Sequence, residues 1–526
     1  MSLNNRRYLP YFLIVVILSA VYIPLILQQS DFRTDDYYLL TIIKQQGVIS
    51  PFDGVQYSYY SAFRLIPMLS LFVDYNIYGP NPLGFYLFNL ALHLATVLLF
   101  FLLLKLLFRQ FFDYGGELLP FLLALAVGLH ADLFYNVLWI CNRTEGLLLF
   151  FYLGAVYSWL RYFAERRKYW YLIGLLSFLL ALLSKEQAIH LPLMFLLLGR
   201  IAMEKRDRAS WRRLLLAAAP IAALAGVVLL LRMVYDPGAL FLTSTISPKK
   251  LFSLIGINLI AFHPTLAMPL FIYFTEHILV AAAVALILVC VGLLGFYRIK
   301  RSTKRIVIAL LIAIAIISFP RALYQVFPRV NSIQVVFLLM TMGVLLLRVR
   351  PRIMFVLAIV FILGQTAGML YELKVWRIET SNDRYIRLLN SEEDDGHASY
   401  TLLTHYHDHA RYTLFFLREG DFGIDSTVQI TPLIYARRYG SHNGDEFQVV
   451  QHGTRFEFRS NEPRAVFLSS PTIPLIPDMT VAVFDRAEGY GYKEAKVVIG
   501  KPQENTRYLI ERNDAFEIVS LTDPRD

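Results

Sequence analysis

The stretch YLPYFLIVVILSAVYIPLIL, residues 8–27, is followed almost at once by SDFRTDDYY, residues 30–38. The first run is apolar and long enough to cross a lipid bilayer as a helix. The second run places Asp31, Asp35 and Asp36 at the end of that helix, where carboxylates are costly to hold near lipid. These residues are therefore functional candidates, although they could also solvate a loop or cap the next helix.

Composition indicates a polytopic membrane protein. The chain has 526 residues, of which 56% are hydrophobic and 14% aromatic, a composition too apolar for an ordinary soluble domain. The formal net charge of +10 would suit a nucleic-acid ligand. The basic residues, however, gather in short loops between apolar runs, where they set membrane topology. Both cysteines, Cys141 and Cys290, lie within apolar runs, so neither a disulfide framework nor a cysteine metal site is expected.

Apolar runs recur along the first 371 residues and predict about eleven membrane-spanning helices. The first run lacks the small-residue cleavage site of a signal peptide, so we expect it to be retained as a span. The expected spans are 8–27, 82–107, 118–134, 138–160, 169–184, 187–200, 211–232, 276–297, 305–320, 330–348 and 352–371.

Charge in the connecting loops predicts the topology. Every second loop is strongly basic, as at 166–168, which indicates a multi-pass topology with a cytoplasmic N-terminus. The extracytoplasmic face then carries a long first loop, 28–81, and everything after about residue 372. Within that loop, 37–46 and 62–78 are expected to form amphipathic or partly buried helices at the interface.

The chain becomes polar after residue 371. Residues 372–526 suffice for one small domain. A strand at 398–403 and a helix near 409–418 are expected to precede further strands. These strands are predicted from alternating sequence at 447–451, 455–459, 465–469, 480–484, 495–499, 508–511 and 516–521. The predicted architecture is a polytopic α-helical membrane domain, 1–371, followed by a C-terminal extracytoplasmic mixed α/β, strand-rich domain, 372–526.

Polar side chains within or beside the apolar runs all fall on the predicted extracytoplasmic side. Carboxylates and cations at one depth are what a polar cavity open to one side requires. Simpler explanations exist for single residues: Lys185 and Glu186 could form a local ion pair, and Arg321 or Arg329 could reach lipid headgroups. The set is Asp35, Asp36, Arg64, His93, His130, Asp132, Asn136, Asn142, Arg143, Glu145, Lys185, Glu186, Arg321, Tyr324, Gln325 and Arg329.

Many of these residues belong to an ordered series of motifs. The series starts with Asp35-Asp36 and continues with FRLIP at 63–67, GPNPLGFYLFNLALH at 79–93, HAD at 130–132, WICNRTE at 139–145 and LSKE at 183–186. It resembles the GT-C superfamily of polyprenyl-phosphate-sugar-dependent glycosyltransferases. Within that superfamily it is most similar to the protein O-mannosyltransferase-like branch, which includes transmembrane, tetratricopeptide-containing enzymes. The resemblance covers residues 1–200 by motif and the later spans by topology.

The sequence departs from that branch in two places. The polar tail has no tetratricopeptide period, and the motif at 130–132 carries Asp132 where relatives more often carry Glu. The acceptor therefore stays open among a protein, a lipid and a glycan.

The resemblance implies a membrane glycosyltransferase that moves a sugar from a polyprenyl-phosphate donor to an extracytoplasmic hydroxyl with inversion. The expected location is a cell inner membrane, with the C-terminal domain in the periplasm. A lipid phosphate is already a good leaving group, whereas the acceptor hydroxyl needs a general base. Asp35 is expected to be that base by its match to the first acid of the family pair. Asp36 is its partner or the base itself, and two adjacent carboxylates raise the pKa of one of them.

The remaining roles concern the donor. Its phosphate requires cations, and arginine suits bidentate contact. The candidates for the phosphate are Lys185, Arg321, Arg329 and Arg64, and those that orient these cations or contact the sugar are Asp132, Glu186, His130 and Tyr324. No cofactor or metal site is assigned, although a carboxylate pair is compatible with a divalent cation. The expected partners are the donor, the acceptor and membrane lipid, and no nucleic acid.

Two other functions fit a chain of this kind. An oligosaccharide ligase or oligosaccharyltransferase would use a lipid-diphosphate donor. A transporter of lipid-linked substrates should have paired halves with broken helices at matching positions. The sequence shows no such pairing.

Overall fold

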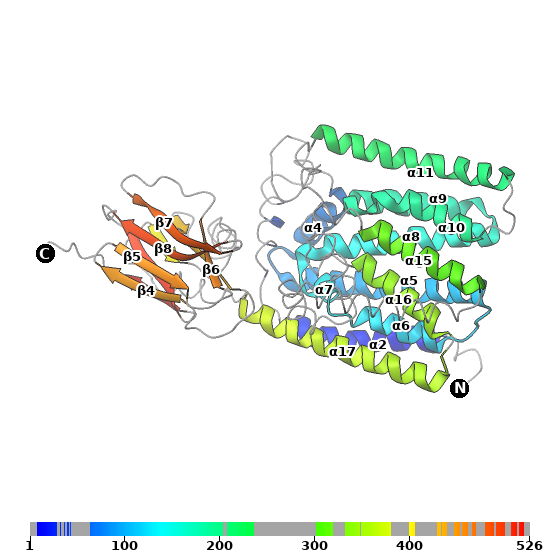
Figure 1. Ribbon diagram of the computed structural model, residues 1–526, viewed down its shortest axis with the longest axis horizontal. Helices are drawn as coiled ribbons and strands as arrows, with labels where there is room; N and C mark the ends of the chain where they lie inside the picture. The colour runs from blue at the N-terminus through cyan, green and yellow to red at the C-terminus, as the bar shows by residue number, and fades with distance from the viewer. Residues whose placement is uncertain are drawn as a thin grey trace. The chain divides into compact units, whose positions relative to one another are not determined.

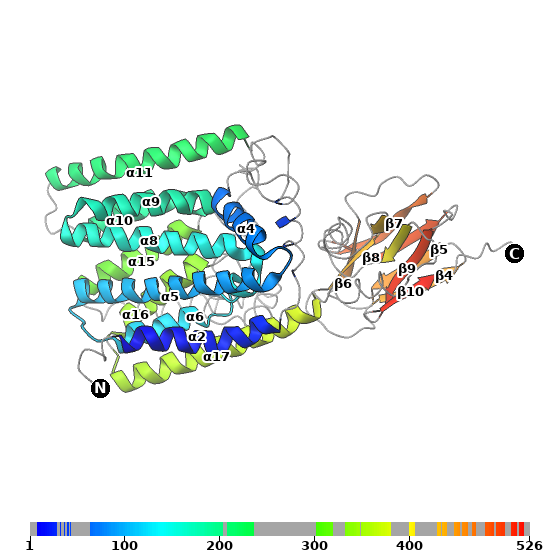
Figure 2. The same ribbon diagram turned by 180° about the vertical axis from the view of Figure 1, so that it is seen from behind.

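The computed structural model contains two compact units, Met1–Ser30 with Gln46–Val375 and Asp31–Gln45 with Trp376–Asp526. Long helices build the first unit, and the strands belong to the second (Figures 1 and 2). The structure describes residues 8–28, 32, 36, 39–40, 43, 64–202, 208–235, 301–318, 332–347, 349–379, 399–404, 429–432, 434–438, 447–452, 455–460, 465–469, 479–488, 491–499, 506–512 and 515–519.

In chain order, the described helices are α2 (Leu9–Leu27), α4 (Leu65–Tyr78), α5 (Pro82–Phe112), α6 (Leu118–Gly128), α7 (Tyr135–Leu138), η2 (Ile140–Asn142), α8 (Arg143–Glu165), α9 (Lys168–Ser184), η3 (Glu186–His190), α10 (Leu191–Ala202), α11 (Arg208–Tyr235), α15 (Arg301–Ser318), α16 (Ser332–Leu346) and α17 (Pro351–Glu379).

Five candidate membrane spans are found among the described residues: Leu9–Leu27, Pro82–Phe112, Ile140–Glu165, Ala209–Leu231 and Pro351–Leu370. Shorter apolar helices accompany them at Leu65–Tyr78, Leu118–Gly128, Lys168–Ser184 and Ser332–Leu346. Each apolar run predicted from the sequence overlaps a helix, except 276–297, which lies outside the described residues. The described part of the chain is thus mostly helical, with apolar helices of the kind that cross membranes.

The predicted span 118–134 is too long, because α6 ends at Gly128. The Gly128 carbonyl accepts hydrogen bonds from the Tyr22 hydroxyl at 2.9 Å and from His93 Nε2 at 3.0 Å. Side chains of α2 and α5 therefore satisfy the carboxyl end of α6, where the last carbonyls of a helix have no intrahelical partner. The chain then turns before α7, which an apolar pattern alone does not predict.

Local sequence defines the ends of α5 and α8. Asn81 Oδ1 accepts a hydrogen bond from the Leu83 amide at 3.0 Å, and Pro82 occupies the first helical position, both favourable at a helix start. At the other ends, Asp113 of α5 and Arg166 of α8 adopt positive φ of 51° and 58°, the left-handed conformation that commonly closes a helix.

Helix α8 forms the centre of the described helical packing, with contacts to α5, α9 and α10 (Figures 1 and 2). Its Trp159 is fully buried and meets Phe195 edge to face, with ring centroids 5.1 Å apart. A Cβ added at Gly174 of α9 would lie 2.3 Å from Trp159 Nε1. The missing side chain therefore lets α9 approach α8, as small residues do between membrane helices.

The outer helices expose large apolar side chains. Leu216 and Leu230 of α11 and Val360 and Leu363 of α17 are all exposed. Large apolar side chains exposed in this way promote association in water, whereas lipid tails solvate them. The helical unit therefore has the surface of a membrane protein.

The strands form two sheets. They are β1 (Ser399–Thr404), β2 (Gln429–Pro432), β3 (Ile434–Arg438), β4 (Phe447–His452), β5 (Arg455–Ser460), β6 (Ala465–Ser469), β7 (Met479–Glu488), β8 (Gly491–Ile499), β9 (Thr506–Arg512) and β10 (Ala515–Val519). One sheet has the order β10-β9-β1-β2, in which β1 pairs in parallel with β2 and β9. The other has the order β3-β6-β8-β5-β4, with β7 also paired to β8, and is antiparallel.

Alternation along β5 shows why the strands were predictable. Phe456 and Phe458 are fully buried, whereas Arg455 and Arg459 are exposed, as expected when successive side chains point to opposite faces. All the predicted strands overlap strands of the structure, while β2 and β3 were not predicted. The helix expected at 62–78 corresponds to α4. The helix expected at 409–418 and most of 37–46 lie outside the described residues.

Candidate functional site

Four charged residues gather where α8 begins and α9 ends. Because only a short turn joins these two helices, the first residues of α8 lie beside the last residues of α9, and α4 contacts both helices (Figure 2). This junction brings together Arg64, Glu145, Lys185 and Glu186, called the polar cluster below. Two cations and two carboxylates at the end of an apolar bundle are unusual, because charges near lipid are retained chiefly for function.

The inner half of the polar cluster is the ion pair between Lys185 and Glu145. Lys185 Nζ donates a hydrogen bond to Glu145 Oε1, and the side chains are only 8% and 2% exposed. Burial lowers the pKa of Lys185, and the Glu145 carboxylate opposes that shift. Arg64 lowers the same pKa further, whereas Glu186 raises it.

Local backbone geometry sets this pairing. The Lys185 amide still donates to the Ala181 carbonyl at 2.9 Å, but Lys185 itself is extended, with φ −160° and ψ 144°. An extended residue and its neighbour direct their side chains to opposite sides. Lys185 therefore meets Glu145 across the helix interface instead of pairing with the adjacent Glu186.

The outer half of the polar cluster is the pair of Arg64 and Glu186. The Arg64 guanidinium lies 3.6 Å from Glu186 Oε1, and the two side chains are 17% and 39% exposed. A looser, more exposed pair contributes little to stability.

A separate buried arginine holds the helices around the polar cluster. The guanidinium of Arg143 lies 2.6 Å from the Asp74 carboxylate, and donates to Asn89 Oδ1 at 2.7 Å and to the Phe85 carbonyl at 3.1 Å. It also lies over the Phe88 ring, 4.4 Å from its centroid. These contacts join α8 to α4 and α5, so Arg143 has a structural role beside the polar cluster.

His130 and Asp132 lie together in the turn after α6. The Asp132 amide donates to His130 Nδ1 at 3.1 Å, and both residues are buried. The intervening Ala131 amide donates to Gln365 Oε1 of α17 at 3.3 Å. This turn is therefore fixed between α6 and α17, and its polar groups belong to the helical unit.

The structure brings together some of the predicted site residues. Arg64, Lys185 and Glu186 belong to the polar cluster, and His130 contacts Asp132. Asp36 is 1% exposed and belongs to the second unit. Asp35, Arg321, Tyr324 and Arg329 lie outside the described residues. Among the residues that the structure covers, no three His, Cys, Asp or Glu side chains gather as a metal site would require.

Sequence reasoning missed the partner of Lys185. Glu145 was recognised only as one of the polar groups beside the spans. Its position two residues after Arg143, at the start of an apolar helix, was a usable signal. Arg143 and Glu145 are two residues apart on one helix and cannot pair with each other, so each buried charge requires a partner from a neighbouring helix.

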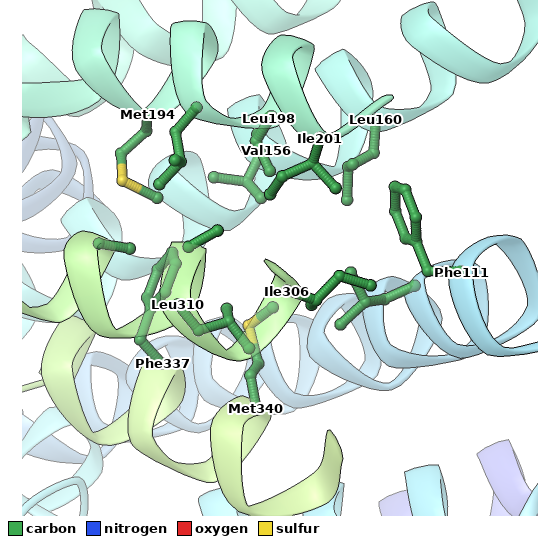
Figure 3. A pocket seen from close by; sticks show the side chains of 14 residues that line it. Phe111, Val156, Leu160, Met194, Leu198, Ile201, Ile306, Leu310, Phe337 and Met340 are labelled. Atoms are coloured by element: carbon green, nitrogen blue, oxygen red, sulfur yellow. The ribbon is translucent and has the colours of Figure 1, made fainter. Parts of the chain in front are cut away.

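The opposite ends of the same helices enclose an apolar crevice (Figure 3). Residues near the carboxyl ends of α5, α8 and α10 line it together with α15 and α16, for example Phe111, Leu160, Ile201, Ile306 and Met340. Every lining residue is apolar, so the crevice offers no group that could bind a phosphate or a sugar. The buried ion pair of Lys185 and Glu145 lies at the other end of α8.

No family model matches the chain, and no curated protein matches it significantly.

Proposed function

We propose that this chain is a membrane glycosyltransferase of the GT-C type, which moves a sugar from a polyprenyl phosphate to an extracytoplasmic hydroxyl with inversion. The observation that carries this proposal is the polar cluster, in which Lys185 and Arg64 come together at one end of an apolar helix bundle. The ordered motif series from Asp35 to Glu186 supports the same function.

The proposed orientation is that of a chain with about eleven spans, a cytoplasmic N-terminus and a periplasmic C-terminal domain. The turn between α8 and α9 carries Arg166, Arg167 and Lys168, whereas Glu145 and Lys185 lie at the far ends of the same helices. Basic loops stay in the cytoplasm. The polar cluster then faces the periplasm, as an extracytoplasmic acceptor requires.

The proposed chemistry is a single displacement. The acceptor oxygen bonds to the anomeric carbon while the bond from that carbon to the phosphate oxygen breaks. The acceptor proton passes to Asp35, or to Asp36 if that residue is the base. The bonding electron pair goes to the lipid phosphate, whose growing negative charge is stabilised by Lys185 and Arg64, with Arg321 and Arg329 as further cations.

The other expected residues would act on the donor. Glu186 orients Arg64 through their ion pair. Asp132, His130 and Tyr324 are proposed to contact sugar hydroxyls or orient the cations. The acceptor is a protein, lipid or glycan hydroxyl.

The test is turnover by purified protein in lipid nanodiscs, with labelled sugar on a polyprenyl monophosphate or on a diphosphate. Wild type should release sugar from the monophosphate. Asp35→Asn should be slower by about 100-fold to 10,000-fold, the usual contribution of a general base. Asp31→Asn is the matched control, because it removes a carboxylate from the same run, and it should retain activity.

Each of the other outcomes would lead to a different conclusion. Loss of activity in Asp36→Asn instead of Asp35→Asn would make Asp36 the base. Turnover only with the diphosphate would indicate a ligase or oligosaccharyltransferase. Substrate movement across the membrane without sugar release would indicate a transporter, and either of these last two results would refute the proposed function.

A further inference from the structure

Glu145 is the buried carboxylate closest to the cation at the centre of the polar cluster. It lies in the first turn of α8, is 2% exposed, and binds Lys185 through Oε1. Its second oxygen, Oε2, is buried and accepts no hydrogen bond within the part of the chain that the structure covers. A carboxylate held in this way acts mainly on the charge of Lys185.

The ammonium group of Lys185 retains capacity for a ligand. It carries three N–H donors, and the only described acceptor within hydrogen-bond distance is Glu145 Oε1. The remaining donors can contact an anionic oxygen. Because the side chain is almost completely buried, however, its positive charge depends on a neighbouring negative charge.

The charged groups that face Lys185 come from three elements. Glu145 lies on α8, Arg64 immediately precedes α4, and Glu186 begins η3. The other buried charges nearby, Arg143 and Asp74, are bound to each other. Since Arg64 opposes the charge of Lys185 and the Glu186 side chain is partly exposed, Glu145 is the dominant buried counter-charge.

We infer that Glu145 is a positioning residue that keeps Lys185 protonated and directed toward the phosphate of the donor. This role rests on the proposed function, in which Lys185 binds that phosphate. Glu145 itself touches neither the sugar nor the acceptor. It determines the pH up to which the phosphate-binding lysine remains charged.

The direction of the expected shift in the pH profile follows from the pKa of Lys185, which burial lowers and Glu145 raises. Glu145→Gln keeps the shape and removes the charge, so the pKa of Lys185 falls further. The lysine then loses its proton at a lower pH, and the alkaline limb of the activity profile moves toward neutral pH. An opposite charge at this range typically shifts a pKa by about one to three units, so we expect a shift of about one pH unit or more.

The experiment measures donor kcat/KM against pH for wild type, Glu145→Gln, Lys185→Arg and the double variant. Arginine stays charged throughout the range, so Lys185→Arg should restore the alkaline limb in the Glu145→Gln background. Glu117→Gln is the control, because Glu117 forms a more exposed ion pair with Lys105, which lies in the carboxyl-terminal part of α5 near the apolar crevice. Its profile should coincide with that of wild type.

Two results would overturn the inference. One is a Glu145→Gln profile that coincides with wild type or is lowered equally at every pH. The other applies even if Glu145→Gln does not fold: Lys185→Arg alone should extend the alkaline limb beyond that of wild type, and an identical limb would show that the charge of Lys185 does not set it.

Failure of the proposed function is separable from failure of this inference. If wild type releases no sugar from any donor, the proposed function fails, and the role of Glu145 toward a phosphate fails with it. The effect of Glu145 on Lys185 can still be measured by competitive acetylation of lysines across pH, with detection by mass spectrometry. Lys185 should become reactive toward acetylation at lower pH in Glu145→Gln than in wild type. Equal reactivity in the two proteins would contradict an effect of Glu145 on the pKa of Lys185.

Discussion

At the scale of single residues, Arg143 and Lys185 show two uses of a buried cation. Arg143 donates to acceptors from α4 and α5 and is completely buried, so its binding capacity is taken up within the protein. Lys185 has one described acceptor, Glu145. The first arrangement fixes helices, whereas the second leaves N–H donors of Lys185 without an acceptor among the described residues.

Arg143→Met should therefore destabilise the protein without a specific effect on donor phosphate binding. The substitution leaves the Asp74 carboxylate buried and unpaired, which typically costs about 3–5 kcal/mol. Thermal unfolding in detergent should show a markedly lower Tm. The double variant Arg143→Met/Asp74→Leu should recover most of the lost stability, because it removes both charges.

The control lies on the same helix. Arg161 pairs with Glu165 at 2.5 Å, one turn apart and partly exposed, and such pairs contribute less than about 1 kcal/mol. Arg161→Met should therefore leave Tm nearly unchanged. If Arg143→Met were equally mild, the structural role of Arg143 would be wrong.

At the scale of elements, the approach of α9 to α8 positions Lys185 beside Glu145. Gly174 of α9 packs against the Trp159 ring of α8 and leaves no room for a Cβ. A glycine at this point is required by packing, because its backbone is helical and imposes no positive φ.

Gly174→Ala should destabilise the pair of helices. The added methyl group would lie 2.3 Å from Trp159 Nε1, and overpacking of this kind costs about 1–3 kcal/mol. Gly226→Ala on α11 is the matched control, because an added Cβ there meets nothing within 4 Å and alanine favours a helix. Thermal unfolding should separate the two variants, and a neutral Gly174→Ala would contradict the described packing.

At the scale of the whole molecule, the helical unit is apolar outside and has two chemically different ends. One end carries the polar cluster, and the other carries the apolar crevice and the basic turn at 166–168. The proposed enzyme would work at the membrane face that the polar cluster occupies. A transporter would require polar groups near mid-depth.

Much of the fold was predictable from the sequence, because long apolar runs and alternating strands carry strong periodic signals. The break at Gly128 was not, since it depends on hydrogen bonds from Tyr22 and His93 on other helices. The short strand β2 ends at Pro432, and a proline usually argues against a strand.

The sequence predicts three members of the polar cluster but not how they pair, and the roles of the predicted site residues stay predictions. Arg64, Lys185 and Glu186 were expected to act together, and the structure brings them together. The pairing of Lys185 with Glu145 depends on the extended backbone at Lys185 and on the packing of α8 against α9. Neither is encoded in local sequence spacing.

The most direct measurement is the affinity of purified protein in nanodiscs for a polyprenyl phosphate and for the corresponding polyprenol. Wild type should bind the phosphate at least about tenfold more tightly, the equivalent of 1.4 kcal/mol. Lys185→Met/Glu145→Gln, which leaves no unpaired buried charge, should lose that preference. Lys105→Met/Glu117→Gln removes an ion pair near the carboxyl end of α5, away from the polar cluster. This variant should keep the preference for the phosphate. Equal affinity of wild type for the two lipids, or an undiminished preference without Lys185, would contradict a phosphate-binding role for the polar cluster.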